Sequence, residues 1–242
     1  NSKIKSKLVM LFIVLSFVPM TIFGFFAYYE LIDTARSKIS TYSSEIMAQL
    51  GESIDRELQE IEYYSMEILS LDIVQNTLLH SETMNPFDIN DAQSIIHSEL
   101  TKKLSLLHDV SDVLLYTGDG RLITAYGSQN TVLNLKNEVL NEFLSKIADK
   151  KGEAVWAALN GADDNIGIFL GREVRSLSDS DRVIGSLIIR INDQLLPELY
   201  RNINVGSGSD ILVFDGDGNV VSGGRSEISN AASYGYRQLA DE

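Results

Sequence analysis

The sequence predicts an α+β protein in which an N-terminal membrane-spanning helix continues into a long stalk helix and then into a module built on an antiparallel sheet. Three observations support this class. Residues 8–29 contain no charged side chain. Apolar residues then recur at steps of three and four, as on one face of a helix. The rest of the chain alternates helical patterns with strand patterns, which is typical of helices packed on a sheet.

The composition excludes several functions. A chain of 242 residues is long enough for one or two domains. Its net charge of -14 argues against a partner made of nucleic acid and against broad docking on anionic lipid. The absence of cysteine excludes disulfides and thiolate metal sites. Because the chain begins with Asn1 and stops in a polar stretch at Glu242, we expect it to be a fragment of a longer protein.

The apolar stretch 8–29 has the length of a membrane span, since about 20 apolar residues cross the hydrocarbon core. Residues 1–7 carry three lysines, which favours a cytoplasmic N-terminus and leaves everything after residue 30 extracytoplasmic. A cleaved signal peptide is the alternative. It usually has a shorter apolar core of about 7–15 residues and a small-residue cleavage site, and neither is present here.

A long extracytoplasmic helix is predicted in residues 30–80, with Asp72 capping a short further helix at its end. The first part of this segment has no proline and would project about 60 Å at 1.5 Å per residue. Its apolar stripe either pairs with a second copy as a coiled coil or docks on its own domain, and both remain open. The stripe consists of Ile32, Ala35, Ile39, Tyr42, Ile46, Leu50, Ile54, Leu58, Ile61, Tyr64, Ile68 and Leu71.

Residues 81–193 form the predicted antiparallel-sheet module. A loop around Pro86 leads into it, and a hairpin turns at Gly118-Asp119-Gly120. We expect its helices to gather on one face of the sheet. The remaining elements are helices in 92–108 and 134–149 and strands in 153–159, 165–174 and 183–191.

A second hairpin repeats the layout of the first. Residues 113–124 (VLLYTGDGRLIT) and 211–222 (ILVFDGDGNVVS) each place a glycine-aspartate turn between apolar runs. We therefore interpret 194–207 as a connecting helix and linker, and 208–242 as the truncated start of a second, membrane-proximal module.

Four stretches together resemble the double Cache sensor region, a pair of PAS-like modules on one long helix, of membrane sensor histidine kinases of the YesM type. They are residues 3–30, 42–79, 111–123 (SDVLLYTGDGRLI), and the segments 183–200 and 208–223 taken together. The order of elements carries this resemblance, and no single motif does.

The resemblance implies a function in signalling. A small-molecule ligand, bound directly or through a solute-binding protein, would favour one packing of the module against the long helix. The helix would pass this movement across the cell membrane, within a homodimer, to a kinase that phosphorylates a response regulator. The sensor regions of a methyl-accepting chemoreceptor or of a membrane-anchored transcription regulator are the alternatives, and a structural stalk protein is a third.

Candidate ligand contacts are Tyr116, Tyr126, Trp156 and Arg172, which lie on or beside predicted strands. An aromatic ring suits a sugar, and a guanidinium pairs with a carboxylate. The alternative is that the aromatic residues belong to the core and Arg172 is solvated. Many double Cache sensors of amino acids carry an arginine followed two residues later by Trp-Tyr, and this string is absent here.

No cofactor, metal or catalytic residue is predicted. Asp215, Asp217 and Asn219 follow the spacing of a calcium loop, but Val220 and Ser226 replace the glycine and glutamate that such a loop requires, so a plain turn is expected. The glycine-rich stretch 206–210 lacks the lysine of a phosphate loop, and we interpret it as a linker. The three histidines, His80, His97 and His108, lack a metal-binding spacing.

Overall fold

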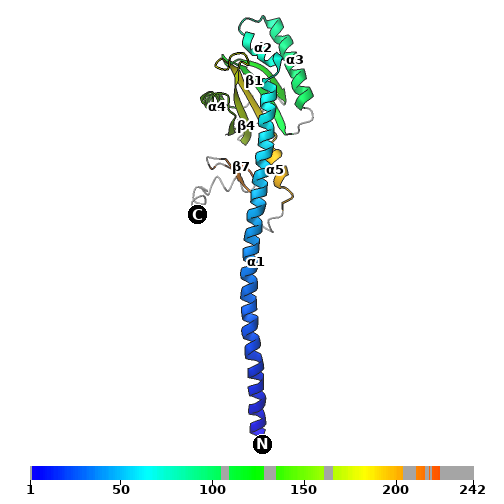
Figure 1. Cartoon of the computed structure of the whole chain (residues 1–242), viewed down its shortest axis with the longest axis vertical. Coiled ribbons are helices and arrows are strands. Elements are labelled where there is room, and N and C mark those ends of the chain that lie inside the picture. The colour runs from blue at the N-terminus through cyan, green and yellow to red at the C-terminus, as the bar shows by residue number, and fades with distance from the viewer. Residues whose placement is uncertain are drawn as a thin grey trace. The chain divides into compact units, whose positions relative to one another are not determined.

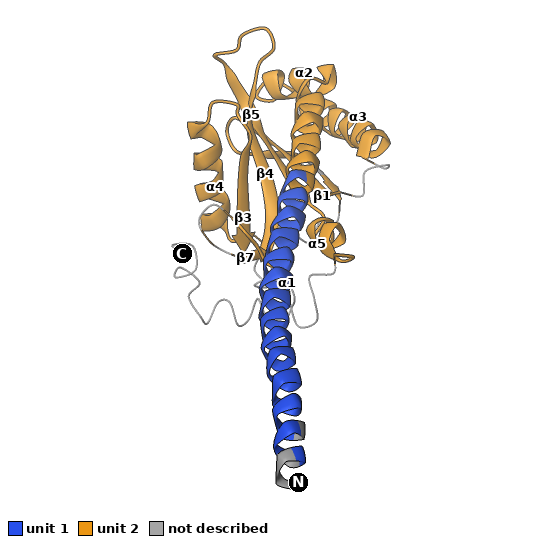
Figure 2. Ribbon diagram, turned by 60° about the horizontal axis from the view of Figure 1, so that its bottom comes forward, with its two compact units in different colours: residues 1–52 blue, residues 53–242 orange. Residues whose placement is uncertain are grey.

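The structure is a computed structural model that describes residues 2–104, 109–127, 135–160, 166–203, 211–215, 218 and 220–223. The chain divides into two compact units, residues 1–52 and residues 53–242 (Figure 2). The elements in chain order (Figure 1) are α1 (Ser2–Leu69), α2 (Asp72–His80), α3 (Pro86–Leu104), β1 (Val110–Thr117), β2 (Leu122–Gly127), α4 (Asn137–Asp149), β3 (Val155–Asn160), β4 (Ile166–Arg175), β5 (Val183–Ile191), α5 (Leu195–Tyr200), β6 (Val213–Phe214) and β7 (Val220–Ser222).

The first unit consists of the N-terminal part of α1. Helix α1 contains a stretch that is long and apolar enough to cross a membrane, and none of that stretch is buried in protein. Pro19 lies inside the helix. The structure thus agrees with the predicted span by length and composition, because an exposed apolar surface of this kind is unfavourable in water.

Two helix starts differ from the sequence predictions. Helix α3 begins at Pro86, not at residue 92, because Asn85 caps it: the Asp88 backbone N–H donates to Asn85 Oδ1 at 2.9 Å. Proline suits this first helical position, where no backbone donor is needed. Asp72 is the first residue of α2 rather than its cap, which is Leu71, and no side chain caps this helix.

A five-stranded antiparallel sheet in the order β2-β1-β5-β4-β3 forms the centre of the second unit. The predicted first hairpin is present, and Gly120 adopts the positive φ of 81° that glycine tolerates in such a turn. The predicted strands in 153–159, 165–174 and 183–191 are β3, β4 and β5. This sheet with its helices confirms the α+β class.

Helices cover both faces of the sheet, so the prediction of a single helical face was wrong. Leu115 packs with residues of α1, α2 and α3, whereas its neighbour Leu114 packs with Phe143 and Ile147 of α4. Successive side chains of a strand point to opposite faces, so α4 lies on the side opposite to α2 and α3 (Figure 2). We call these sides the α4 face and the α1–α3 face.

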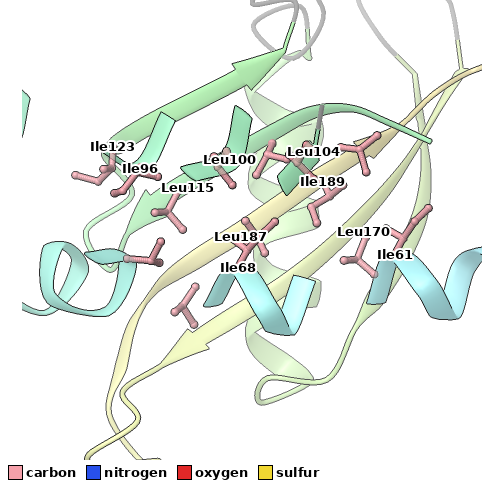
Figure 3. Close-up of a cluster of buried hydrophobic side chains, with 14 of the residues drawn as sticks. Ile61, Ile68, Ile96, Leu100, Leu104, Leu115, Ile123, Leu170, Leu187 and Ile189 are labelled. Atoms are coloured by element: carbon pink, nitrogen blue, oxygen red, sulfur yellow. The ribbon is translucent and has the colours of Figure 1, made fainter. Parts of the chain in front are cut away.

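The larger core lies on the α1–α3 face (Figure 3). Ile61 and Ile68 of α1 pack there against strand residues that include Leu187 and Ile189. Burying each such side chain contributes about 1.5–3 kcal/mol to the free energy of folding. The apolar stripe of α1 is therefore used, in this part of the helix, to dock on its own domain.

The second hairpin is formed by β6 and β7, in which Val213 pairs with Ser222 and Phe214 with Val220. The linker in 206–210 and the turn residues Gly216, Asp217 and Asn219 lie outside the described residues. Helix α5 is the predicted connecting helix, and the hydroxyl groups of Tyr200 and Ser222 form a hydrogen bond of 2.8 Å between it and β7. That this hairpin opens a second module remains a prediction.

Candidate functional site

The four candidate ligand contacts fall in three separate places. Tyr116 packs in the apolar cluster of the α4 face. Tyr126, Trp156 and Arg172 belong to the α1–α3 face, but Tyr126 is on β2 and Trp156 on β3, which are the two outer strands of the sheet. Only Trp156 and Arg172 are therefore brought together.

Trp156 and Arg172 lie side by side beneath α1. Trp156 pairs with Leu170 across β3 and β4, which makes Arg172 its diagonal neighbour on the same face. The Trp156 indole donates a hydrogen bond of 2.7 Å to Glu62 Oε1 of α1. Burial lowers the pKa of the Arg172 guanidinium, and the negative charge of Glu62 opposes this shift. Both residues thus face a carboxylate of the long helix.

Glu62 was not among the residues that the sequence predicted. It lies in the polar part of the helical pattern of residues 30–71, where glutamates are abundant and usually solvated. Its partner Trp156 is 94 residues away. Only the docking of α1 on the sheet brings the two together.

Tyr126 contacts a histidine of α3. The rings of Tyr126 and His97 lie with their centroids 5.9 Å apart, in a tilted arrangement. Tyr126 also packs against the apolar core of the α1–α3 face. Tyr126 is thus partly buried at the edge of this core, and its role as a ligand contact stays a prediction.

Tyr116 forms part of a polar row on the α4 face. It pairs with Ser186 of β5, which in turn pairs with Glu173 of β4. Burial raises the pKa of the Tyr116 hydroxyl. Glu173 is buried and forms an ion pair of 2.7 Å with Arg175 Nε.

A second charged group on the α4 face was missed by the sequence analysis. Arg190 of β5 is buried, pairs with Asp112 of β1 at 3.8 Å, and donates two hydrogen bonds of 2.9 and 3.0 Å to the Asp193 carboxylate. Its guanidinium lies over the ring of Phe169, 6.0 Å from the centroid. In the sequence, Asp112 and Arg190 each stand out as a charged residue inside an apolar strand. Only the register of β1 with β5 shows that the two are neighbours.

The α4 face carries polar and charged groups beside its apolar cluster. These groups are the buried opposite charges of Asp112 and Arg190 and the hydroxyl of Tyr116. In the part of the chain that the structure describes, no group of three or more His, Cys, Asp or Glu side chains is arranged to hold a metal ion.

The fold is similar to that of a solved extracytoplasmic-type sensor domain. The sensor domain of the V. cholerae histidine kinase DctB superposes with a TM-score of 0.54 at 12% identity, over 79% of this chain and 69% of that one. A weaker likeness, with a TM-score of 0.49 at 12% identity over 74% of this chain and 66% of that one, is found with the ligand-binding domain of the Campylobacter jejuni chemoreceptor Tlp3 in complex with L-norvaline. No protein-family model matches the chain.

The sequence is similar to that of the sensor histidine kinase YesM of Bacillus subtilis (strain 168). The two are 24% identical over 181 residues, which is 74% of this chain and 30% of YesM. The chain thus spans less than a third of the length of this relative. Together with the fold, this similarity confirms the resemblance to the Cache and PAS-like sensor regions of such kinases.

Proposed function

We propose that this chain is the extracytoplasmic ligand-sensing region of a transmembrane sensor histidine kinase. The observation that carries the proposal is the joint occurrence of a kinase-type sensor fold and an apolar helix able to span a membrane. The similarity to a sensor histidine kinase over 181 residues supports the same function. The kinase reaction, the homodimer and the response regulator belong to the rest of the protein in this proposal.

Within this function, we propose that the ligand is read on the α4 face. Tyr116, Arg190 and Asp112 supply a hydroxyl and opposite charges there, beside an apolar cluster. On the other face, Trp156 and Arg172 face Glu62 of α1, and Tyr126 packs in the core. A ligand bound directly or through a solute-binding protein would favour one of two packings of the module against α1. The shift in their populations is set by the difference in the ligand's affinity for the two packings.

Helix α1 is the proposed route of the signal. It extends from Ser2 to Leu69 and contains both the candidate membrane span and the residues that pack on the sheet. A shift of about 1–2 Å in such a helix is the size of movement that signalling proteins use. The N-terminus is cytoplasmic in this proposal, and the sheet is outside the membrane.

The test is a ligand screen on the full-length protein in membrane nanodiscs, using panels of sugars, carboxylates and amino acids. A sensor should gain thermal stability from at least one solute, because a ligand that binds only the folded state stabilises it. The same solute should change autophosphorylation of the full-length protein from ATP. Absence of any phosphorylation, with or without solute, would contradict the kinase function.

A further inference from the structure

The contact between Glu62 and Trp156 joins the long helix to an outer strand of the sheet. The Trp156 Nε1–H donates to Glu62 Oε1 at 2.7 Å. The indole N–H has no acceptor capacity, and a hydrogen bond to a charged acceptor is stronger than one between neutral groups. Trp156 is also the only tryptophan in residues 1–242.

Arg172 adds a positive charge beside this contact. Its Nη1 donates to the Gly152 carbonyl oxygen at 3.3 Å, while its buried Nε has no hydrogen-bond partner among the described residues. Glu62 is the carboxylate whose charge acts on this guanidinium. Strand β3 thus supplies the hydrogen-bond donor of Trp156 to the Glu62 carboxylate, and the adjacent strand β4 supplies the positive charge of Arg172 nearby.

The contacts of α1 with the strands at Ile61 and Ile68 are of a different kind, and a further polar contact, the ion pair of Glu67 with Lys103, joins α1 to α3 and not to the sheet. Ile61 and Ile68 are buried in the apolar core, with 2% of each side chain exposed. Apolar burial is not directional, so it selects the face of the helix without fixing its position along the helix axis. A hydrogen bond fixes that position, because it weakens steeply with distance and angle.

We propose that Glu62 is a positioning residue that holds α1 in one register on the sheet. The effect of Glu62 on signalling rests on the proposed function, since α1 is the proposed route of the signal. Trp156, first considered as a ligand contact, serves here as the hydrogen-bond partner of Glu62, and Arg172 adds a positive charge nearby. When the contact opens, α1 loses its hydrogen bond to β3 and can shift over the apolar surface about its remaining contact with α3, the ion pair of Glu67 with Lys103, which gives the helix its second position.

The test measures the position of the helix in the full-length protein. Residues 1–242 contain no cysteine, and any cysteine elsewhere in the full-length protein is replaced by serine before labelling. Spin labels at Gln59→Cys of α1 and Ser145→Cys of α4, both exposed, therefore report one distance by electron spin resonance. Glu62→Ala and Trp156→Phe should each shift this distance by about 1–2 Å or add a second population. An unchanged distribution in both variants would overturn the proposal.

Two further variants make the test specific. Glu62→Gln keeps an oxygen that accepts from Trp156 and should restore the native distance. Glu60→Ala is the matched control, because Glu60 accepts a hydrogen bond from Tyr64 of the same helix. A shift in Glu60→Ala equal to that in Glu62→Ala would also overturn the proposal. Trp156→Phe conserves an aromatic ring and Glu62→Gln the volume, so both remain informative if Glu62→Ala does not fold.

Kinase output separates this inference from the proposed function. A helix that moves together with a change in basal autophosphorylation, about fivefold or more, supports both. A helix that moves while output stays constant supports the positioning role of Glu62 and contradicts the proposed route of the signal.

Discussion

Ile147 of α4 lies directly over Gly171 of β4, so closely that a Cβ atom at position 171 would come within 2.2 Å of Ile147 Cδ1. The added Cβ atom would also lie 2.8 Å from the Cζ atom of the Phe143 ring. The absence of a side chain at Gly171, in the middle of β4, is thus what lets α4 approach the sheet. This close approach defines the α4 face, on which we propose that the ligand is read.

Gly171→Ala should destabilise the module, because the added methyl group forces α4 or its side chains to move. Overpacking of this kind costs about 1–3 kcal/mol. Urea unfolding measures the difference in free energy. Gly118→Ala is the matched control, since its Cβ would meet neighbouring atoms at an ordinary 3.8 Å. Equal stabilities for the two variants would refute the close packing of α4.

Ile61→Ala tests the docking of α1 on the sheet. The side chain is 2% exposed, and its truncation should lower the free energy of unfolding by about 2–5 kcal/mol, from lost burial and the cavity left behind. Met66→Ala removes an apolar side chain of the same helix that is 57% exposed. This control should stay within about 0.5 kcal/mol of the parent protein. If both variants unfold alike, the buried face of α1 is assigned incorrectly.

Arg190→Ala should be among the most damaging single substitutions of a charged residue. It leaves the buried Asp112 carboxylate without the guanidinium charge, and breaking a buried pair in this way costs about 3–5 kcal/mol. Arg201→Ala removes an exposed partner of Glu198 at 3.9 Å and should cost about 1 kcal/mol or less. Thermal and urea unfolding of both variants make the comparison. A small loss in Arg190→Ala would show that the charges on the α4 face are solvated.

Glu57 of α1 gives the stability a defined dependence on pH. Burial first, and then the negative charges of Asp109 and Glu60, raise the pKa of the Glu57 carboxyl above 4.5. The folded protein therefore retains a proton that the unfolded chain has already lost, and this contribution to stability declines as the pH rises from 4.5 through the pKa of the folded state.

Glu57→Gln should remove this contribution. The variant should be more stable than the parent near pH 7 and should lose less stability between about pH 4.5 and neutrality. Unfolding free energies at a series of pH values provide the measurement. Identical pH profiles for the two proteins would mean that Glu57 is solvated in the folded state.

Much of the fold could be predicted because its strands have clear boundaries and period. The segments 165–174 and 183–191 correspond to β4 and β5 within one residue. The arrangement of helices on both faces was missed, although the consecutive apolar pairs Leu114-Leu115 and Ile188-Ile189, which send side chains to both sides, were a signal for it. The start of α3 was missed because Pro86 was interpreted as part of a loop instead of a first helical residue.

The candidate site was less predictable, because it depends on register and on contacts distant in sequence. Tyr116 and Tyr126 come from the two strands of one hairpin but pack on opposite faces. The pairing of Asp112 with Arg190 follows from the alignment of β1 with β5, which neither strand encodes alone. Glu62 reaches Trp156 only after α1 has docked on the sheet.

The central claim is that α1 carries the sensor module outside the membrane while its N-terminus remains in the cytoplasm. Residues 1–242 contain no cysteine. Once any cysteine elsewhere in the full-length protein is replaced, single cysteines at Ser145 of α4 and at Ser6 can be labelled with a membrane-impermeant maleimide in intact protoplasts. We expect Ser145→Cys to react in intact protoplasts and Ser6→Cys to react only after the membrane is permeabilised. Labelling of Ser6→Cys from outside, or protection of Ser145→Cys until permeabilisation, would contradict the account.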